Sequence, residues 1–196
     1  MTLTELQNEV YTITNRPDLS ARTQAAIRAA TLKLHQSDFY SKDLFETGIV
    51  FSTAAYLQQL EYRPLIPRYR ALKYIRKSDV DGTDTLPFLD IVVPELTLDS
   101  YGLNRNDVAY QTGEVIQIRS STELQYIFLG CYLDPDITVS GYSSWIAINH
   151  PFAIIYEAAS QIFKQTGKTE EWNAYKIMAQ EQANTITVTN TQTVGY

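Results

Sequence analysis

The sequence predicts an α+β fold in which N- and C-terminal helices form one bundle, with an antiparallel β insertion between them and an extended C-terminal arm. Three observations support this prediction. Apolar residues recur at helical spacing at both ends of the chain. The middle carries runs of β-branched and aromatic residues separated by turn signals, and the last residues alternate with a period of two. Helices and strands segregated in this way are typical of α+β proteins and not of parallel α/β sheets.

The N-terminal segment, residues 1–44, is expected to hold two helices of the bundle. Thr2 and Glu5 have the spacing of a capping box, which marks the start of a helix. Apolar residues then follow at helical intervals, namely Leu6, Val10 and Ile13. Pro17 ends this helix, because the residue before a proline disfavours the helical conformation. The second helix is expected over residues 19–36, and its alanine-rich face allows a C-terminal helix to approach closely.

The middle of the chain, residues 45–145, is expected to form the antiparallel β-rich insertion. Strands are expected at four places, over residues 46–63, 89–93, 108–119 and 123–133. The third of these contains Gly113 where a hairpin would turn. The fourth is the longest apolar run, so we place it at the centre of the sheet.

Residues 146–183 are expected to form a helical hairpin that completes the bundle. Pro151 suits a first helical turn, where its missing N–H is no loss. Apolar residues then share one face, namely Ile155, Ala158, Ala159 and Ile162. Gly167 is suited to end this helix because it accepts a positive φ, and Thr169 can cap the next. The loop between them is short, which predicts antiparallel neighbours.

The last segment, residues 184–196, carries no charge and is expected to be an extended arm. β-branched and apolar residues occupy its even positions, namely Ile186, Val188, Val194 and Tyr196, and threonines occupy its odd positions. Two interpretations are open: a frayed tail, or a strand that pairs with the sheet edge of another chain. The absence of Lys, Glu and Pro favours the second, because edge strands left in water usually carry such residues.

Composition limits the classes of function. The chain has 196 residues, of which 44% are hydrophobic, and a formal net charge of −6 with a pI of about 4.9. This charge argues against a domain whose affinity comes from neutralising phosphates. No apolar run approaches the roughly 20 residues of a membrane span, and the N-terminus lacks the layout of a signal peptide, so we expect an intracellular origin and no membrane partner. Tyrosine, with 14 copies, is typical of interfaces.

No catalytic or metal-binding constellation stands out, so we expect no enzyme, no cofactor, no metal and no catalytic residue. The chain lacks G-x-S-x-G, H-E-x-x-H and C-x-x-C motifs. His35, near a helix end, is expected to contact backbone carbonyls. Cys131 is expected to be a buried structural thiol. The acidic stretch 79–84 departs from the spacing of a calcium loop and is expected to be a turn.

The stretch 68–77 is rich in Lys and Arg and contains tyrosines. Such a patch could contact a nucleic-acid backbone. The apolar residues within it and the aspartates that follow it favour instead a solvated or interface strand.

Four segments together resemble the head-to-tail adaptor proteins of tailed bacteriophages. They are Ile13-Thr-Asn-Arg-Pro-Asp-Leu19, the run from Ala26 to Leu44, Arg70-Ala-Leu-Lys-Tyr-Ile-Arg76, and Ala153-Ile-Ile-Tyr-Glu-Ala-Ala-Ser-Gln-Ile-Phe163. The resemblance covers most of the chain in the same order, and the central strands match no motif of the family.

The resemblance implies a virion structural protein, made in the host cytoplasm and placed at the capsid vertex. Such adaptors form a ring, usually of twelve copies, that docks on the portal protein and joins it to a tail or nozzle protein. DNA passes through the ring without specific binding, which fits the acidic balance. The C-terminal arms commonly reach the portal, which implies portal contacts at Ile186, Val188, Val194 and Tyr196. The alternatives are a tail-tube or tail-completion protein of the same particle, or a nucleic-acid-binding module.

Overall fold

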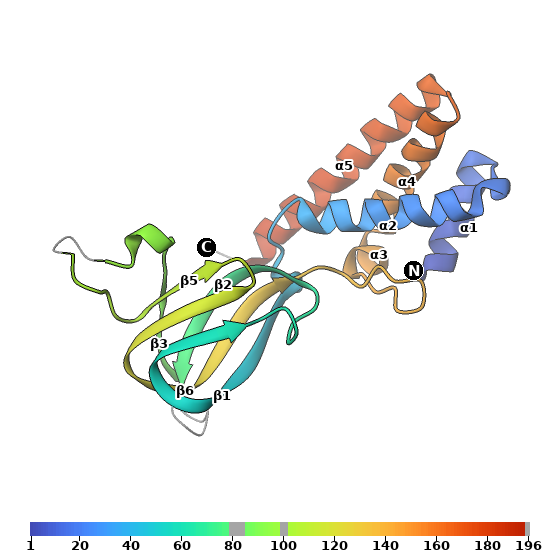
Figure 1. Cartoon of the computed structure of the whole chain (residues 1–196). Coiled ribbons are helices and arrows are strands. Elements are labelled where there is room, and N and C mark those ends of the chain that lie inside the picture. Colours follow the sequence, from blue (N-terminus) through green and yellow to red (C-terminus); the bar gives the residue numbers. More distant parts are fainter. Residues whose placement is uncertain (79–84, 99–101, 195–196) are drawn as a thin grey trace. The chain divides into compact units, whose positions relative to one another are not determined.

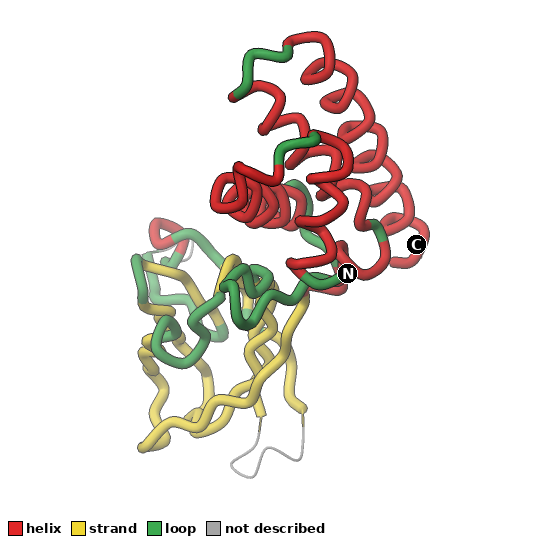
Figure 2. The backbone as a smooth tube through the Cα atoms, turned by 90° about the vertical axis from the view of Figure 1, so that its right-hand side faces the viewer, coloured by secondary structure: helices red, strands yellow, loops and turns green. Residues whose placement is uncertain are grey.

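The computed structural model describes residues 1–78, 85–98 and 102–194 and divides the chain into two compact units. The first, which we call the helical unit, comprises residues 1–43 and 134–196. The second, the β unit, comprises residues 44–133. Figure 1 labels the helices and strands of both units, and Figure 2 distinguishes helix, strand and loop by colour.

The helical unit packs five α-helices around one apolar core. The helices are α1 (Leu3–Thr14), α2 (Ser20–Gln36), α3 (Trp145–Asn149), α4 (Pro151–Gln165) and α5 (Thr169–Val194). Short 3₁₀ turns, η1 (Pro17–Leu19) and η2 (Ser41–Asp43), lie before α2 and after it.

Helix α4 is the centre of this unit, because its apolar face is almost wholly buried and it packs against each of the other four α-helices. The expected packing of the second helix on the C-terminal hairpin is confirmed by the α2–α4 contact, and α4 and α5 are neighbours as expected. The capping box of Thr2 and Glu5 is present at the start of α1. Gly167 ends α4 with a φ of 76°, which a residue with a Cβ rarely adopts.

Glu157 ties three helices together from inside this unit. Its carboxylate, which is 6% exposed, accepts hydrogen bonds from Lys33 Nζ of α2 at 2.6 Å and from Lys176 Nζ of α5 at 3.1 Å. Burial alone would raise the pKa of this carboxyl, but the two lysines outweigh it and hold the pKa below its ordinary value. Glu157 therefore stays charged at neutral pH.

The β unit is a six-stranded mixed sheet organised around β6 (Val115–Leu133). The other strands are β1 (Leu44–Glu61), β2 (Tyr69–Ser78), β3 (Thr85–Phe88), β4 (Asp90–Ile91) and β5 (Val108–Thr112); a 3₁₀ turn, η3 (Pro94–Leu96), follows β4. β1 pairs along the length of β6. β2 pairs with the second half of β6 and also with β3. β5 pairs with the first half of β6 and also with β4. The sheet curls around its own apolar core until it is nearly closed. The central position expected for the strand at 123–133 is confirmed.

Two glycines leave room for tyrosine side chains of the same sheet. A Cβ added to Gly130 of β6 would overlap the ring of Tyr74, and a Cβ added to Gly48 of β1 would overlap Tyr126. Tyr74 reaches across Gly130 to donate a hydrogen bond to Glu46 Oε2 at 2.6 Å. The rings thus replace the missing side chains and bind the three strands together.

The predicted fold class, one bundle carrying an antiparallel β insertion and an extended arm, is wrong. The β region is a compact unit with a core of its own, not an insertion of a helical bundle. Its sheet is mixed, because β4 pairs with β5 in parallel. The physical reason is that the chain between residues 44 and 133 carries enough inward-facing apolar residues to close a sheet on itself, including Ile75, Ile116 and Ile127.

The expected arm is wrong as well, because α5 continues to Val194. Alternation of threonines predicted a strand, but a helix can also accommodate threonine when its hydroxyl bonds the carbonyl four residues earlier. Thr185, Thr187 and Thr189 each do so. Ala179, Ala183 and Ile186 follow at i, i+4 and i+7, so the helical stripe of the hairpin extends into the segment.

The expected ranges 1–44, 45–145, 146–183 and 184–196 stay a prediction. The two compact units of the structure meet at 43/44 and 133/134. The turn expected at 79–84 lies outside the described residues. Among the residues that the structure describes, no helix combines the length and the apolar character needed to cross a bilayer.

Candidate docking surface

The structure separates Ile186 from Val188, two of the four residues expected to bind a partner. Ile186 is 1% exposed and lies in the core of the helical unit. Val188 is 56% exposed on the opposite side of α5. Val194 is the last described residue of the helix, and Tyr196 lies outside the described residues. Of the four, Val188 is the one whose described side chain is free to contact another protein.

The C-terminal part of α5 is held on its own unit by two contacts. Ile186 packs into the apolar core. One turn later, Asn190 Oδ1 accepts hydrogen bonds from the backbone N–H and the hydroxyl of Ser41, at 3.4 and 3.5 Å. A small cavity of about 30 Å³ remains beside them, lined in part by Lys42 and Trp145. The segment is therefore a docked helix with one covered face and one open face.

We call the open face the α5 outer face and define it by Ile177, Glu181, Asn184 and Val188. These residues recur at i, i+4, i+7 and i+11, so they share one side of the helix, and all four are exposed. Ile177 is 62% exposed. No charged residue follows Glu181 in the chain. The outer face is thus a helical surface with apolar ends and a largely uncharged second half, which suits contact with another protein.

A second feature of the helical unit is a buried chain of polar groups. His35 Nδ1 lies 2.8 Å from Asp43 Oδ1, and His35 Nε2 lies 2.9 Å from Ser144 Oγ. Trp145 Nε1 donates to the same Asp43 oxygen at 2.8 Å. The expectation that His35 contacts backbone carbonyls is therefore wrong for its ring nitrogens, because a carboxylate and a hydroxyl occupy both.

This order of groups is the one that activates serine nucleophiles. Here, however, Ser144 Oγ also accepts the backbone N–H of Ala147 at 3.2 Å and so caps α3. Ser144 is 5% exposed, and His35 is 2% exposed. Ser144 Oγ is thus engaged as a helix cap as well as by His35. The cluster's evident role is to join the ends of α2, η2 and α3.

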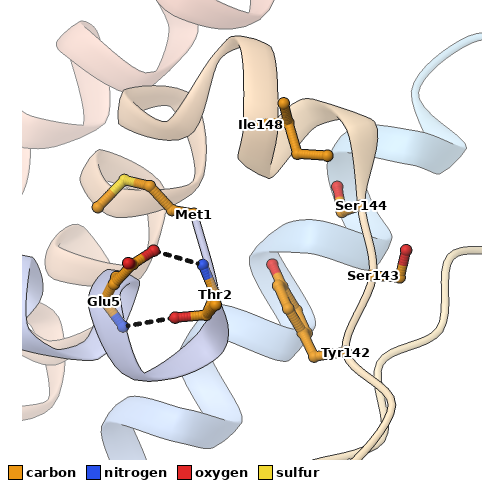
Figure 3. A pocket seen from close by; sticks show the side chains of 7 residues that line it. All are labelled: Met1, Thr2, Glu5, Tyr142, Ser143, Ser144 and Ile148. Carbon is orange, nitrogen blue, oxygen red and sulfur yellow. Dashed lines mark hydrogen bonds between the residues drawn. The ribbon is translucent and has the colours of Figure 1, made fainter.

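A pocket of about 270 Å³ lies beside this cluster, and Ser144 is one of the residues that line it (Figure 3). Figure 3 shows the capping box at its wall, where the Thr2 N–H donates to Glu5 Oε2 at 2.8 Å and the Glu5 N–H donates to Thr2 Oγ1 at 3.3 Å. Ile148, which is 69% exposed, stands at the same pocket. Among the polar groups that line the pocket, Thr2 and Glu5 cap α1, and the Tyr142 hydroxyl lies 2.6 Å from Thr31 Oγ1 of α2.

The β unit carries a different surface on β2, where cations lie over aromatic rings. Arg76 stands over the ring of Phe128 at 5.0 Å, and Arg70 and Lys73 stand over Tyr132 at 5.5 and 5.9 Å. Arg76 is also paired with Glu46 at 2.6 Å. The pKa of Glu46 lies below its ordinary value, first because Tyr74 donates a hydrogen bond to it and also because of Arg76.

Metal and thiol chemistry find no support in the described part of the chain. No group of three or more His, Cys, Asp or Glu side chains there is arranged to hold a metal ion. Cys131 is fully buried in the β unit, and burial raises the pKa of its thiol to about 11. A thiol with such a pKa remains protonated at neutral pH and is a poor nucleophile.

Comparison with known proteins adds no family: no protein-family model matches the chain, and no curated protein matches it.

Proposed function

We propose that the chain is a virion structural protein, the head-to-tail adaptor of a tailed bacteriophage, which docks on the portal and joins it to the tail around the DNA exit channel. The observation that carries the proposal is the place of the four segments that resemble this family. They occupy the last two residues of α1 with η1, the greater part of α2 with η2, the middle of β2, and most of α4. These are the elements that build the core of the helical unit and the central ladder of the β unit.

The α5 outer face supports docking through a helix. The face stands on a helix of 26 residues that is fixed at Ile186 and Asn190, so that binding orders no flexible segment. A preorganised surface loses less conformational entropy on association than a disordered arm would. The portal is therefore proposed to contact the outer face of α5.

The charge balance supports a channel that does not grip DNA. By the sequence, each unit contains eight Lys or Arg residues and eleven Asp or Glu residues. Neither unit is thus a basic module, and a ring of acidic subunits repels the phosphate backbone that passes through it.

The test is binding to the portal protein of the same phage, measured by sedimentation with the full chain. Val188→Lys places a charge at the apolar C-terminal end of the proposed contact, and we expect it to weaken binding at least tenfold, or about 1.4 kcal/mol. Thr187→Lys is the matched control, because Thr187 is exposed on the same helix about 100° away. Equal binding by both variants and the unaltered chain would remove α5 from the contact, and no binding by any of them would contradict the adaptor function.

A nucleic-acid-binding module is a second candidate, favoured by one observation. Arg70, Lys73 and Arg76 lie over aromatic rings on β2, and bases could stack on such rings while cations meet phosphates. Its test is the salt dependence of binding to single- and double-stranded DNA in solution. Affinity that falls steeply with salt and is lost in Lys73→Glu would favour this candidate over the adaptor.

A further inference from the structure

The last turns of α5 are held on the helical unit without a charged side chain of their own. Ile186 packs into the apolar core, and Asn190 Oδ1 accepts the two hydrogen bonds from Ser41, at 3.4 and 3.5 Å. These lengths are at the long end for hydrogen bonds. No Asp, Glu, Lys, Arg or His follows Glu181 in the chain, so no side chain of residues 186–194 can form an ion pair with the surface beneath it.

That surface carries two basic side chains, Lys42 of η2 and His150 at the junction of α3 and α4. Lys42 Nζ lies 4.9 Å from the centre of the Trp145 ring. The His150 ring meets the same indole edge to face, with ring centres 6.4 Å apart. Both side chains line the cavity of about 30 Å³ at the end of α5, and its other walls are formed by Ser41, Trp145, Ile186, Thr189 and Asn190. The two basic groups thus meet the end of α5 at one place.

The position of His150 disfavours a positive charge on its ring. Burial lowers the pKa of His150, and the nearby Lys42 lowers it further. His150 directly precedes Pro151, the first residue of α4, so it stands at the end of a 15-residue helix that carries a partial positive charge. α3 ends at the same residue with the opposite polarity, but it has five residues and opposes this effect weakly. The ring is therefore neutral at pH 7.5.

The other titratable groups around Trp145 are already engaged. The Asp43 carboxylate accepts the Trp145 N–H and lies 2.8 Å from His35 Nδ1. The first carboxylate of α4, Glu157, accepts hydrogen bonds from two lysines. α5 presents uncharged residues to the cavity. A proton on His150 would thus share its surroundings with the cation of Lys42 and with carboxylates that other groups hold.

We propose that His150 is a pH-sensitive switch that keeps the end of α5 docked while its ring is neutral and loosens it when the ring is protonated. Protonation places a second cation at a cavity whose α5 wall has no charge to balance it. The repulsion between the two basic groups is relieved when Ile186 and Asn190 move away and water enters. Residues 186–194 then open locally, while the core of α4 stays folded. The α5 outer face changes with them, because Val188 lies between Ile186 and Asn190.

The direction of the pH dependence follows from the lowered pKa of His150. The ring binds its proton more readily in the open form, so the docked form is fully stable above the ordinary pKa of about 6.5 and loses stability as the pH falls below it. Between pH 7.5 and 5.5 histidine is the side chain that changes charge, and the chain has two, His35 and His150. Substitution of His150 therefore assigns the effect. The switch does not rest on the proposed adaptor function.

The experiment is hydrogen–deuterium exchange of the full chain at pH 7.5 and 5.5, corrected for the intrinsic pH dependence of exchange. We expect opening of residues 186–194 to increase about two- to fivefold at the lower pH, the usual effect of one charge near a helix end. Peptides from α4 are the internal reference and should be unchanged. His150→Gln should abolish the increase, and Lys42→Gln should reduce it. Lys164→Gln is the matched control, because Lys164 also lies over a tryptophan ring, that of Trp172 at 5.4 Å, but does not line the cavity.

Titration of the two histidine rings by nuclear magnetic resonance gives a second readout. The ring signal that disappears in His150→Gln identifies His150, and its pKa should lie below about 6.5 and rise in Lys42→Gln but not in Lys164→Gln. The proposal is overturned if residues 186–194 exchange equally at both pH values, or if the difference persists in His150→Gln. Opening of α4 to the same extent as the end of α5 also overturns it, because the change would then be global unfolding.

Discussion

Removing the buried side chain of Ile186 tests whether the last segment of the chain is a packed helix. Ile186 is 1% exposed and contacts the core of the helical unit. Replacing it with alanine removes three carbons from that core and leaves a cavity. Changes of this kind cost about 2–5 kcal/mol. We expect a value near 2–3 kcal/mol, because α5 is close to its end there and can partly relax, and because alanine is the better helix former.

The assay is urea unfolding of Ile186→Ala followed by circular dichroism at a helical wavelength, with Val188→Ala as the matched control. Val188 is two residues away on the same helix and 56% exposed, so its truncation should change the free energy of unfolding by less than about 0.5 kcal/mol. For a chain of this size, the loss at Ile186 corresponds to a fall in melting temperature of roughly 5–10 °C. If both variants unfold alike, the segment is not packed and the helical end of α5 is refuted.

Three further predictions concern other contacts. Glu157→Gln should lower the free energy of unfolding by about 1–2 kcal/mol at pH 7, because the two lysine partners lose their anion but are half exposed and can be solvated. The same decrease at pH 3 would contradict an ion-pair origin. Gly130→Ala should lower the free energy of unfolding by about 1–3 kcal/mol, since the added Cβ would displace the ring of Tyr74. In the variant that already carries Tyr74→Ala, Gly130→Ala should change it very little. Asp107→Asn should cost about 1 kcal/mol at neutral pH, after screening is allowed for, because the carboxylate holds the buried cation of Lys77 at 2.8 Å. Burial opposes the shift, but Lys77 and Ser121 outweigh it and lower the pKa of Asp107 to about 2. The contribution of Asp107 to stability is therefore present above pH 3.8 and disappears as the pH falls to about 2, where the unaltered chain and the variant should unfold alike.

Local signals predicted the parts of the fold that depend on neighbours in the sequence. Thr2 and Glu5 are three residues apart, so the sequence alone indicates their mutual capping, and α1 begins there. The apolar run that forms the second half of β6 likewise identified the centre of the sheet. A continuous apolar run is typical of a strand covered on both faces, and no residue from Leu124 to Leu133 is exposed.

Long-range contacts could not be predicted in the same way. His35 meets Ser144, which is 109 residues away, and nothing beside either residue indicates the pairing. The prediction of an extended arm is wrong for a related reason. Alternation of threonine with isoleucine and valine is compatible with a strand, but the burial of Ile186 against the other helices favours a helix. The helical spacing of Ala179, Ala183 and Ile186 was the available signal.

The proposed adaptor function is tested most directly by cryo-electron microscopy of the tailed-phage particle that, under this proposal, contains the chain. The adaptor function predicts density for α1 to α5 and the β unit in copies repeated around the axis between portal and tail, with the α5 outer face against the portal. A particle in which the chain is absent, or lies away from that joint, would contradict the claim.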